Sequence, residues 1–260
     1  MAKNNVATVP ENKLALTTDE LLDQYSGQGV SKAQEDNLVP LIYILQKQSP
    51  QVEKRDPRYV EGAEPADIWL RNAPNPIVKG EQGILFQPCY FTVDWVEWVP
   101  RDKGGGFVTR YPEPPADVSK RVDPQNPNRI KYLRPNGNEV MQTRNHVGYV
   151  QTGDGGTPMP FVIPMTSSGH TVSRQWMTDM NRKTTASGKT APSFGYWYRL
   201  KTVMRQNQLG AWYTWEVKEE GRASDDDVRR GAELFMAFDA GTKQVEIPVS
   251  NNEDDSTKPM

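Results

Sequence analysis

The sequence predicts a mainly β protein with few helices, arranged as a β-barrel with long insertions. Aromatic and β-branched residues recur with a period of two over 90–99 and 196–218, which is typical of strands with one buried face. Apolar residues recur at helical spacing over only two segments, 169–182 and 225–240. Strands therefore dominate, and the stretches between them are rich in proline and glycine, which favour turns.

The composition argues against a membrane protein, a disulfide-bonded protein and a cysteine-based zinc protein. Only 36% of the 260 residues are apolar and the mean hydropathy is −0.74, so loops or tails are expected to form part of the chain. There is no run of 18 apolar residues, which predicts no membrane partner and a cytoplasmic location. The single cysteine, Cys89, excludes an internal disulfide and a cysteine-based zinc site, and no metal or cofactor is predicted.

The net charge of −2 conceals a basic centre between acidic ends. Residues 97–145 carry nine bases and six acids, and residues 146–218 carry eight bases and three acids. Residues 219–260 carry five bases and eleven acids. The local field at the centre of the chain would attract a polyanion, although solvated faces also vary in sign by chance.

The chain begins and ends with polar segments. Residues 1–36 are predicted to be flexible, with one short helix at 18–24, and residues 249–260 form an acidic tail that is too polar to pack. A single barrel domain is predicted over 37–248. Its first element, 37–48, contains Pro40, which favours extended structure over a helix.

A long strand with a proline-rich insertion comes next. Residues 84–99 read as a strand that is interrupted near Pro88 and bulged at Trp98 and Val99. The insertion, around 100–145, contains six prolines between Pro112 and Pro135, which predict irregular structure over most of it. The exception is a hairpin around Asn136-Gly137. The bases of the insertion are expected to form a wall of a binding groove; they are Arg101, Lys103, Arg110, Lys120, Arg121, Arg129, Lys131, Arg134 and Arg144.

Strands at 146–151 and 160–165 lead into the first predicted helix, 169–182. Its apolar stripe is expected to pack in the core and consists of Val172, Trp176, Met177 and Met180. The second helix is expected to begin after the N-cap Ser224 and to end near Gly241. Its stripe is predicted to be Val228, Ala232, Phe235 and Phe238.

The hairpin at 196–218 is the segment most suggestive of function. One face is apolar and is expected to point inward; it carries Tyr196, Tyr198, Leu200, Met204, Ala211, Tyr213, Trp215 and Val217. The other face mixes rings and cations; it carries Trp197, Arg199, Lys201, Arg205, Trp212 and Lys218. Rings that stack on bases beside cations that follow phosphates suit single-stranded nucleic acid. A half-buried sheet with a basic outer face would give the same pattern.

Three patterns that can mark enzymes are weak here. Gly188-Lys189-Thr190 resembles the end of a phosphate-binding loop, but Lys183 stands where that motif needs its first glycine. The two histidines, His146 and His170, are expected to be structural. The Glu216-Val217-Lys218 strand matches a nuclease pattern, yet the nearest upstream acid is predicted on a helix. The protein is therefore not expected to be an enzyme.

The predicted order of strand, strand, strand, helix and hairpin is that of an OB-fold barrel. With segments 41–50, 172–176 and 196–202 and the acidic tail, it resembles bacteriophage single-stranded DNA-binding proteins. The resemblance implies non-specific coating of single-stranded DNA in phage replication and recombination, in the host cytoplasm. It also implies that the acidic tail contacts replication or recombination proteins. The tail departs from the family pattern because it closes with Lys258-Pro259-Met260, and the insertion is longer than such a barrel needs.

The predicted nucleic-acid-binding residues lie on the hairpin and on the helix before it. They are Arg174, Arg182, Lys183, Trp197, Arg199, Lys201, Arg205, Trp212 and Lys218. The alternative interpretation is a phage structural or assembly protein without catalytic activity. The sequence does not determine the oligomeric state or the preference for DNA over RNA.

Overall fold

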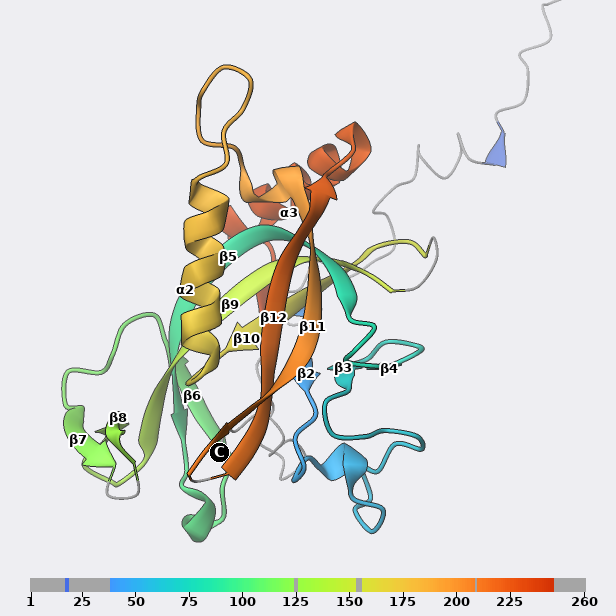
Figure 1. The fold of residues 1–260 in the computed structure, drawn as a ribbon. Helices are drawn as coiled ribbons and strands as arrows, with labels where there is room; N and C mark the ends of the chain where they lie inside the picture. The colour runs from blue at the N-terminus through green and yellow to red at the C-terminus, as the bar shows by residue number, and fades with distance from the viewer. Residues whose placement is uncertain (1–16, 19–37, 124–125, 153–155, 209, 246–260) are drawn as a thin grey trace, which may run out of the picture.

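The computed structural model describes residues 17–18, 38–123, 126–152, 156–208 and 210–245. The predicted flexible segment, almost all of the helix expected at 18–24 and the acidic tail therefore lie outside the described residues. Within the described part the protein is mainly β, with a strongly curled sheet (Figure 1). The predicted fold class is confirmed.

Five strands form the body of the barrel. In spatial order they are β10 (Met159–Met165), β9 (Glu139–Gln151), β5 (Ile84–Trp98), β11 (Tyr196–Asn207) and β12 (Gly210–Arg222). Helix α2 (Gly169–Asn181) connects the third of these strands in the sequence to the fourth. This connectivity is that of an OB-type barrel left open between β10 and β12.

An N-terminal segment bridges the open side of the barrel. It consists of β1 (Leu38–Val39) and β2 (Ile42–Ile44), as expected for an extended element around Pro40. At one end the Val162 backbone N–H donates to the Pro40 carbonyl (2.8 Å). At the other end the Gln46 side chain donates to the Tyr213 carbonyl and accepts from the Tyr213 backbone N–H (both 2.9 Å). The amide of Gln46 thus takes the place of a strand residue along β12.

Short elements support this bridge. β2 continues into a small sheet with β3 (Ile68–Leu70) and β4 (Ile77–Val78), and the 3-10 turn η2 (Pro50–Val52) follows it in sequence. β1 pairs in parallel with β13 (Gln244–Val245). The two ends of the described domain therefore meet.

The insertion is more regular than its prolines suggest. It contains the 3-10 turn η3 (Arg101–Lys103) and the strands β6 (Phe107–Tyr111), β7 (Ser119–Asp123) and β8 (Asn126–Leu133). The prediction of mostly irregular structure was wrong, because most of the prolines lie in the connections and leave room for these strands. The Asn-Gly turn was predicted correctly, with Gly137 at a φ of 85° between β8 and β9.

Strand β5 joins the barrel to this second half of the sheet. It pairs with β9 along its length, whereas its other edge pairs with β11 at its start and β6 at its end. The interruption expected near Pro88 is instead a bulge between Pro88 and Tyr90, and the strand continues through it. The bulge predicted at Trp98 and Val99 lies between Glu97 and Trp98, one position earlier than expected.

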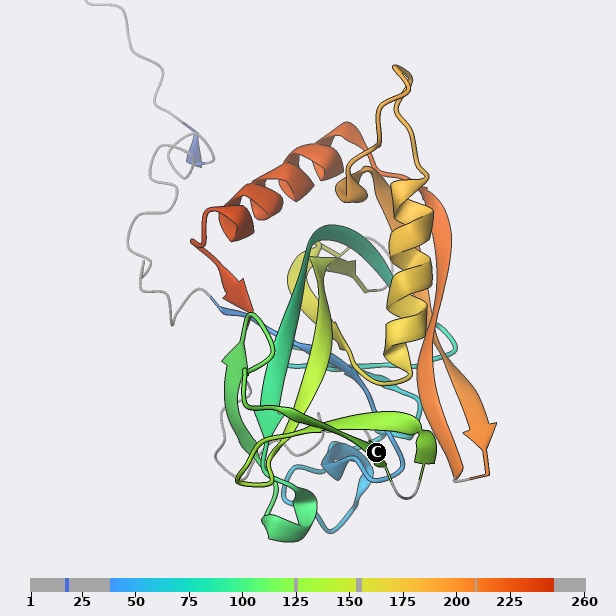
Figure 2. The same cartoon turned by 90° about the vertical axis from the view of Figure 1, so that its left-hand side faces the viewer.

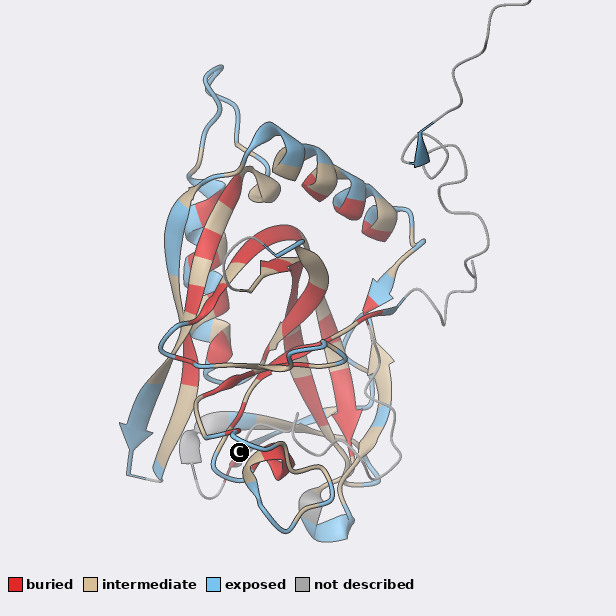
Figure 3. Ribbon diagram, turned by 90° about the vertical axis from the view of Figure 1, so that its right-hand side faces the viewer, coloured by how far each residue is buried: buried red, intermediate tan, exposed pale blue. Residues whose placement is uncertain are grey.

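Two helices cover the barrel on different sides, as Figures 2 and 3 show. α2 buries Trp176 and Met180 as predicted, together with Ser173. α3 (Asp225–Asp239) begins with a capping box between Ser224 and Asp227. Its buried residues are Gly231, Leu234 and Phe238, and Phe235 is 39% exposed, so the predicted α3 stripe was partly wrong.

Candidate nucleic-acid interface

The β11–β12 hairpin follows the predicted alternation within the barrel. Tyr196, Tyr198, Leu200 and Trp215 are all buried, as expected for the apolar face. Met204 was predicted to point inward but is 59% exposed, because the tip of the hairpin extends past the barrel and has no core to cover. Thr214, which alternation places on the outer face beside Trp212 and Glu216, is buried.

Most cations of the predicted site are engaged by acids. Both guanidinium contacts of Arg199 to Glu220 measure 3.0 Å, and Lys218 lies 3.3 Å from Glu216. Lys183 pairs with Glu219, and Arg182 approaches Asp179 at 3.9 Å. Exposed ion pairs of this kind stabilise little, but they lower the local positive potential that a phosphate backbone would meet.

The two predicted stacking tryptophans are only half exposed. The Trp197 indole N–H donates to an Asp227 carboxylate oxygen (3.0 Å) at the start of α3. The indole nitrogen of Trp212 is buried without a hydrogen-bond partner in the described part of the chain. The remaining predicted cations are Arg174 and Arg205, which are exposed, and Lys201, which is half-buried opposite Glu216.

A different surface brings rings and cations together more directly. On the sheet formed by β5, β9, β8 and β7, residues directly opposite one another share a face. The aromatic–basic strip, as we name it, occupies the face on which α2 packs. It comprises Phe91 and Trp95 of β5, Lys120 of β7, Tyr132 of β8, Arg144 of β9 and Arg174 of α2.

Contacts within the aromatic–basic strip form two groups, one of Trp95, Tyr132 and Lys120 and the other of Phe91 and Arg144. The rings of Trp95 and Tyr132 meet edge to face, with centroids 5.1 Å apart. The Lys120 ammonium lies 5.7 Å from the Tyr132 ring centre, and the Arg144 guanidinium lies 4.9 Å from that of Phe91. Both distances fall within the range of cation–π attraction. The strip therefore places aromatic rings and positive charges next to one another on one face of the sheet.

No acid in the described part of the chain balances the charge of Arg144. Its Nε donates to Ser173 Oγ (2.8 Å) on α2, and no carboxylate among the described residues forms an ion pair with it. Burial, and secondarily the charge of Arg174, lowers the pKa of Arg144. Arginine nevertheless stays charged, so two neighbouring cations share this end of the strip.

The histidines have structural surroundings, as predicted. His146 is buried, and its Nε2 is hydrogen-bonded to Ser173 Oγ (2.8 Å). Burial, with a smaller effect of Arg144, lowers the pKa of His146 to about 3, so the ring is neutral near pH 7. Ser173 can then accept from Arg144 and donate to His146. The Nε2 atom of His170 lies 2.9 Å from the Gln142 carbonyl.

A buried carboxylate holds the insertion against β5. Glu97 accepts from the Tyr111 hydroxyl of β6 and from the Asn138 side chain, each at 2.6 Å. The Arg134 guanidinium lies 3.7 Å away. Glu97 thus ties β6 and the β8–β9 turn to the strand that carries Trp95, which fixes how Tyr132 meets Trp95.

Comparison with known proteins identifies the lineage of the chain. A family model described as Pam3 phage gp34-like protein matches residues 11–244. The chain belongs to this phage gp34-like family. No curated protein and no solved structure shows significant similarity to it.

The described part of this gp34-like protein contains no group of three or more side chains able to hold a metal ion. The same residues include no helix that is both long and apolar enough to cross a membrane.

Only part of the strip is visible in the sequence. The alternation of Phe91 and Trp95 is visible in the sequence, and the insertion bases that include Lys120 and Arg144 were expected to line a groove. What the sequence hides is the pairing of β5 with β9, which places Arg144 near Phe91, and the packing of α2, which adds Arg174.

Proposed function

We propose that this phage gp34-like protein binds single-stranded DNA along the aromatic–basic strip. The observation that supports the proposal is the contact of Arg144 with Phe91 and of Lys120 with Tyr132, where Arg144 has no acidic partner in the described part of the chain. Such a surface offers rings for stacking beside cations for phosphates.

Stacking accounts for the preference for single strands and for the lack of sequence specificity. A ring on a sheet face can stack only on a base that is not already stacked in a duplex. Every base has a π-face, so stacking tolerates any sequence. The protein would thereby coat single-stranded DNA during phage replication or recombination in the host cell.

The hairpin contributes a second wall in this proposal. Lys201 and Arg205 supply cations beyond the strip, in addition to Arg174 at its α2 end. Arg182, Lys183, Arg199 and Lys218 add less because each lies beside an acid. Trp197 and Trp212 add part of a ring face each. The acidic segment at 246–260 is proposed to contact replication or recombination proteins.

Fluorescence anisotropy with an oligodeoxythymidylate tests the proposal. Arg144→Ala should weaken binding and flatten its salt dependence, whereas Arg199→Ala, a matched removal of a paired cation, should change binding much less. If Arg144→Ala binds as tightly as the wild type, the strip is not the site.

A structural or assembly role is the second candidate. Val122 and Ile130 face each other across β7 and β8 and are 60% and 54% exposed, which is unusual for apolar residues. Under this alternative the pair would meet another protein subunit. Sedimentation tests this alternative: the wild type should assemble and Ile130→Lys should remain monomeric. Together with no binding of oligonucleotide by either protein, that result would favour a structural role.

A further inference from the structure

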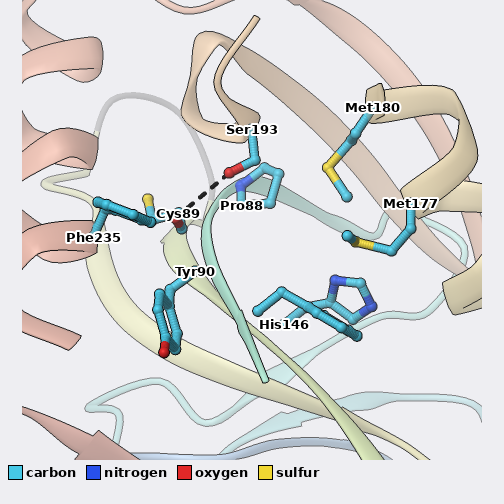
Figure 4. A pocket seen from close by; sticks show the side chains of 9 residues that line it. Pro88, Cys89, Tyr90, His146, Met177, Met180, Ser193 and Phe235 are labelled. Atoms are coloured by element: carbon cyan, nitrogen blue, oxygen red, sulfur yellow. Dashed lines mark hydrogen bonds between the residues drawn. The ribbon is translucent and has the colours of Figure 1, made fainter. Parts of the chain in front are cut away.

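A cavity of about 250 Å³ opens next to the aromatic–basic strip. It lies at the bulge of β5, between α2 and α3, as Figure 4 shows. Met177 and Met180 of α2 form one side, and Tyr90 and Phe235 form the other. The remaining lining residues are Pro88, Cys89, Phe91, His146 and Ser193.

The cavity lies where no strand of the described chain pairs with one edge of β5. β11 pairs with β5 at Ile84–Phe86 and β6 pairs with it at Trp95–Trp98. Between these stretches no described strand pairs with that edge of β5. The 3-10 turn η4 (Ser193–Gly195) covers part of the gap, and the Ser193 hydroxyl donates only a long hydrogen bond (3.5 Å) to the Cys89 carbonyl. That hydroxyl can therefore turn toward a ligand.

Phe91 belongs both to the strip and to the cavity wall. The Arg144 guanidinium lies 4.9 Å from the Phe91 ring centre, and the His146 ring lies 5.0 Å from it. A phosphate bound by Arg144 and Arg174 would place the attached nucleotide at the cavity mouth. Phe235, on the opposite wall, is 39% exposed.

The lining suits a flat, neutral ring. Methionine sulfur is polarisable and contacts aromatic rings favourably, and Met177 and Met180 stand side by side at this wall. No wall residue is charged near neutral pH: burial lowers the pKa of His146 to about 3 and raises that of Cys89 to about 12. The volume of the cavity is below the roughly 300–1,000 Å³ typical of pockets for drug-sized ligands, so it suits a smaller group such as a single ring.

We propose that this cavity receives one nucleobase of the bound single strand, turned out of the strip beside Phe91. The inference rests on the proposed function and adds to it a defined position for one base. It predicts that one nucleotide of the bound strand is held differently from its neighbours.

Filling the cavity tests the proposal. Met177→Trp should block it, and Met236→Trp is the matched control, since Met236 is 58% exposed and does not line the cavity. With an oligodeoxythymidylate of about 16 nucleotides, Met177→Trp should bind roughly tenfold more weakly and the control should bind as the wild type does. On the same strand with abasic positions throughout, wild type and Met177→Trp should bind alike, because no base remains to lose.

Methyl NMR of the wild type tests the proposal even if Met177→Trp fails to fold. The Met177 and Met180 methyl signals should shift when the oligodeoxythymidylate is added and should not shift with the abasic strand. A wild type that binds the strand without these shifts, or a folded Met177→Trp that binds it normally, overturns the cavity proposal alone. A wild type that binds no oligonucleotide overturns the proposed function and the cavity proposal together.

Discussion

Two buried carboxylates on one strand respond to the fold in opposite ways. Burial alone would raise the pKa of Glu97, but hydrogen bonds from Tyr111 and Asn138 outweigh it and lower the pKa. Burial dominates at Asp94 and raises its pKa, although Arg110 and Asn145 oppose the shift. Glu97 accepts two hydrogen bonds of 2.6 Å, whereas Asp94 accepts one of 2.8 Å from Asn145 and lies 3.5 Å from Arg110, which is not enough to offset its burial.

A pH titration of stability should reveal the Glu97 anchor. Folding lowers the pKa of Glu97, so the ionised carboxylate stabilises the folded protein at any pH above the ordinary glutamate pKa of about 4.3. This stabilisation is lost as the pH falls through the lower pKa of the folded state. Glu97→Gln should therefore destabilise the protein at pH 7 and reduce the loss of stability on acidification, as measured by urea unfolding. Folding raises the pKa of Asp94, so Asp94→Asn should instead increase the loss of stability on acidification. Parallel curves for wild type and Glu97→Gln would contradict the assignment.

Two tryptophans should separate binding from stability. Trp215→Ala should cost about 3–5 kcal/mol of unfolding free energy because it empties a buried site. Trp95 is a half-exposed ring of the strip, so Trp95→Ala should instead cost about 1–3 kcal/mol of binding free energy for single strands, through the loss of base stacking. Melting temperature and anisotropy, measured on both variants, check the pair. Loss of affinity in Trp215→Ala at a temperature where it stays folded would contradict this division.

At the scale of elements, the strands and helices were largely predictable and the site was not. Alternation in the β11–β12 hairpin and helical spacing in α2 follow from local pattern, and the structure reproduces both. The neutralisation of Arg199 by Glu220 depends on register, since the two residues lie diagonally across the hairpin. The strip depends on which strand β9 pairs with. Neither fact is encoded in a single segment.

Releasing a paired cation on the hairpin should alter DNA binding. Glu220→Gln removes the acid beside Arg199, so one more cation becomes available to a phosphate. The slope of log affinity against log salt should steepen by about 0.7 for one added phosphate contact. Glu233→Gln on α3, which changes the net charge equally, should leave the slope unchanged. Equal effects of both variants would indicate a general charge effect.

At the scale of the whole molecule, salt should weaken binding. Five cations line the proposed path: Lys120, Arg144, Arg174, Lys201 and Arg205. If about three to five of them contact phosphates, the slope of log affinity against log salt should lie near −2 to −3.5. Anisotropy titrations across salt concentrations measure it. Affinity that does not change with salt would argue against any binding through these cations.

The acidic segment should oppose the same binding. Residues 246–260 carry four acids and one base, so they should repel DNA or compete with it for the cations. Truncation after Ser250 should tighten single-strand binding, chiefly at low salt, where screening is weakest. The comparison needs the full chain and the truncated chain at matched salt. Equal or weaker binding after truncation would contradict competition by this segment.

The bridge across the barrel ties together the earliest and latest parts of the domain to be synthesised. Gln46 pairs with Tyr213, 167 residues later in the chain, and β1 pairs with β13 at residues 244–245. During synthesis on the ribosome, the bridge can therefore close the open side of the barrel only after nearly all of the domain has emerged. Contacts this distant in sequence also favour slow folding. We therefore expect the barrel to close late in synthesis, and incompletely closed chains are the form in which aggregation or chaperone binding would occur.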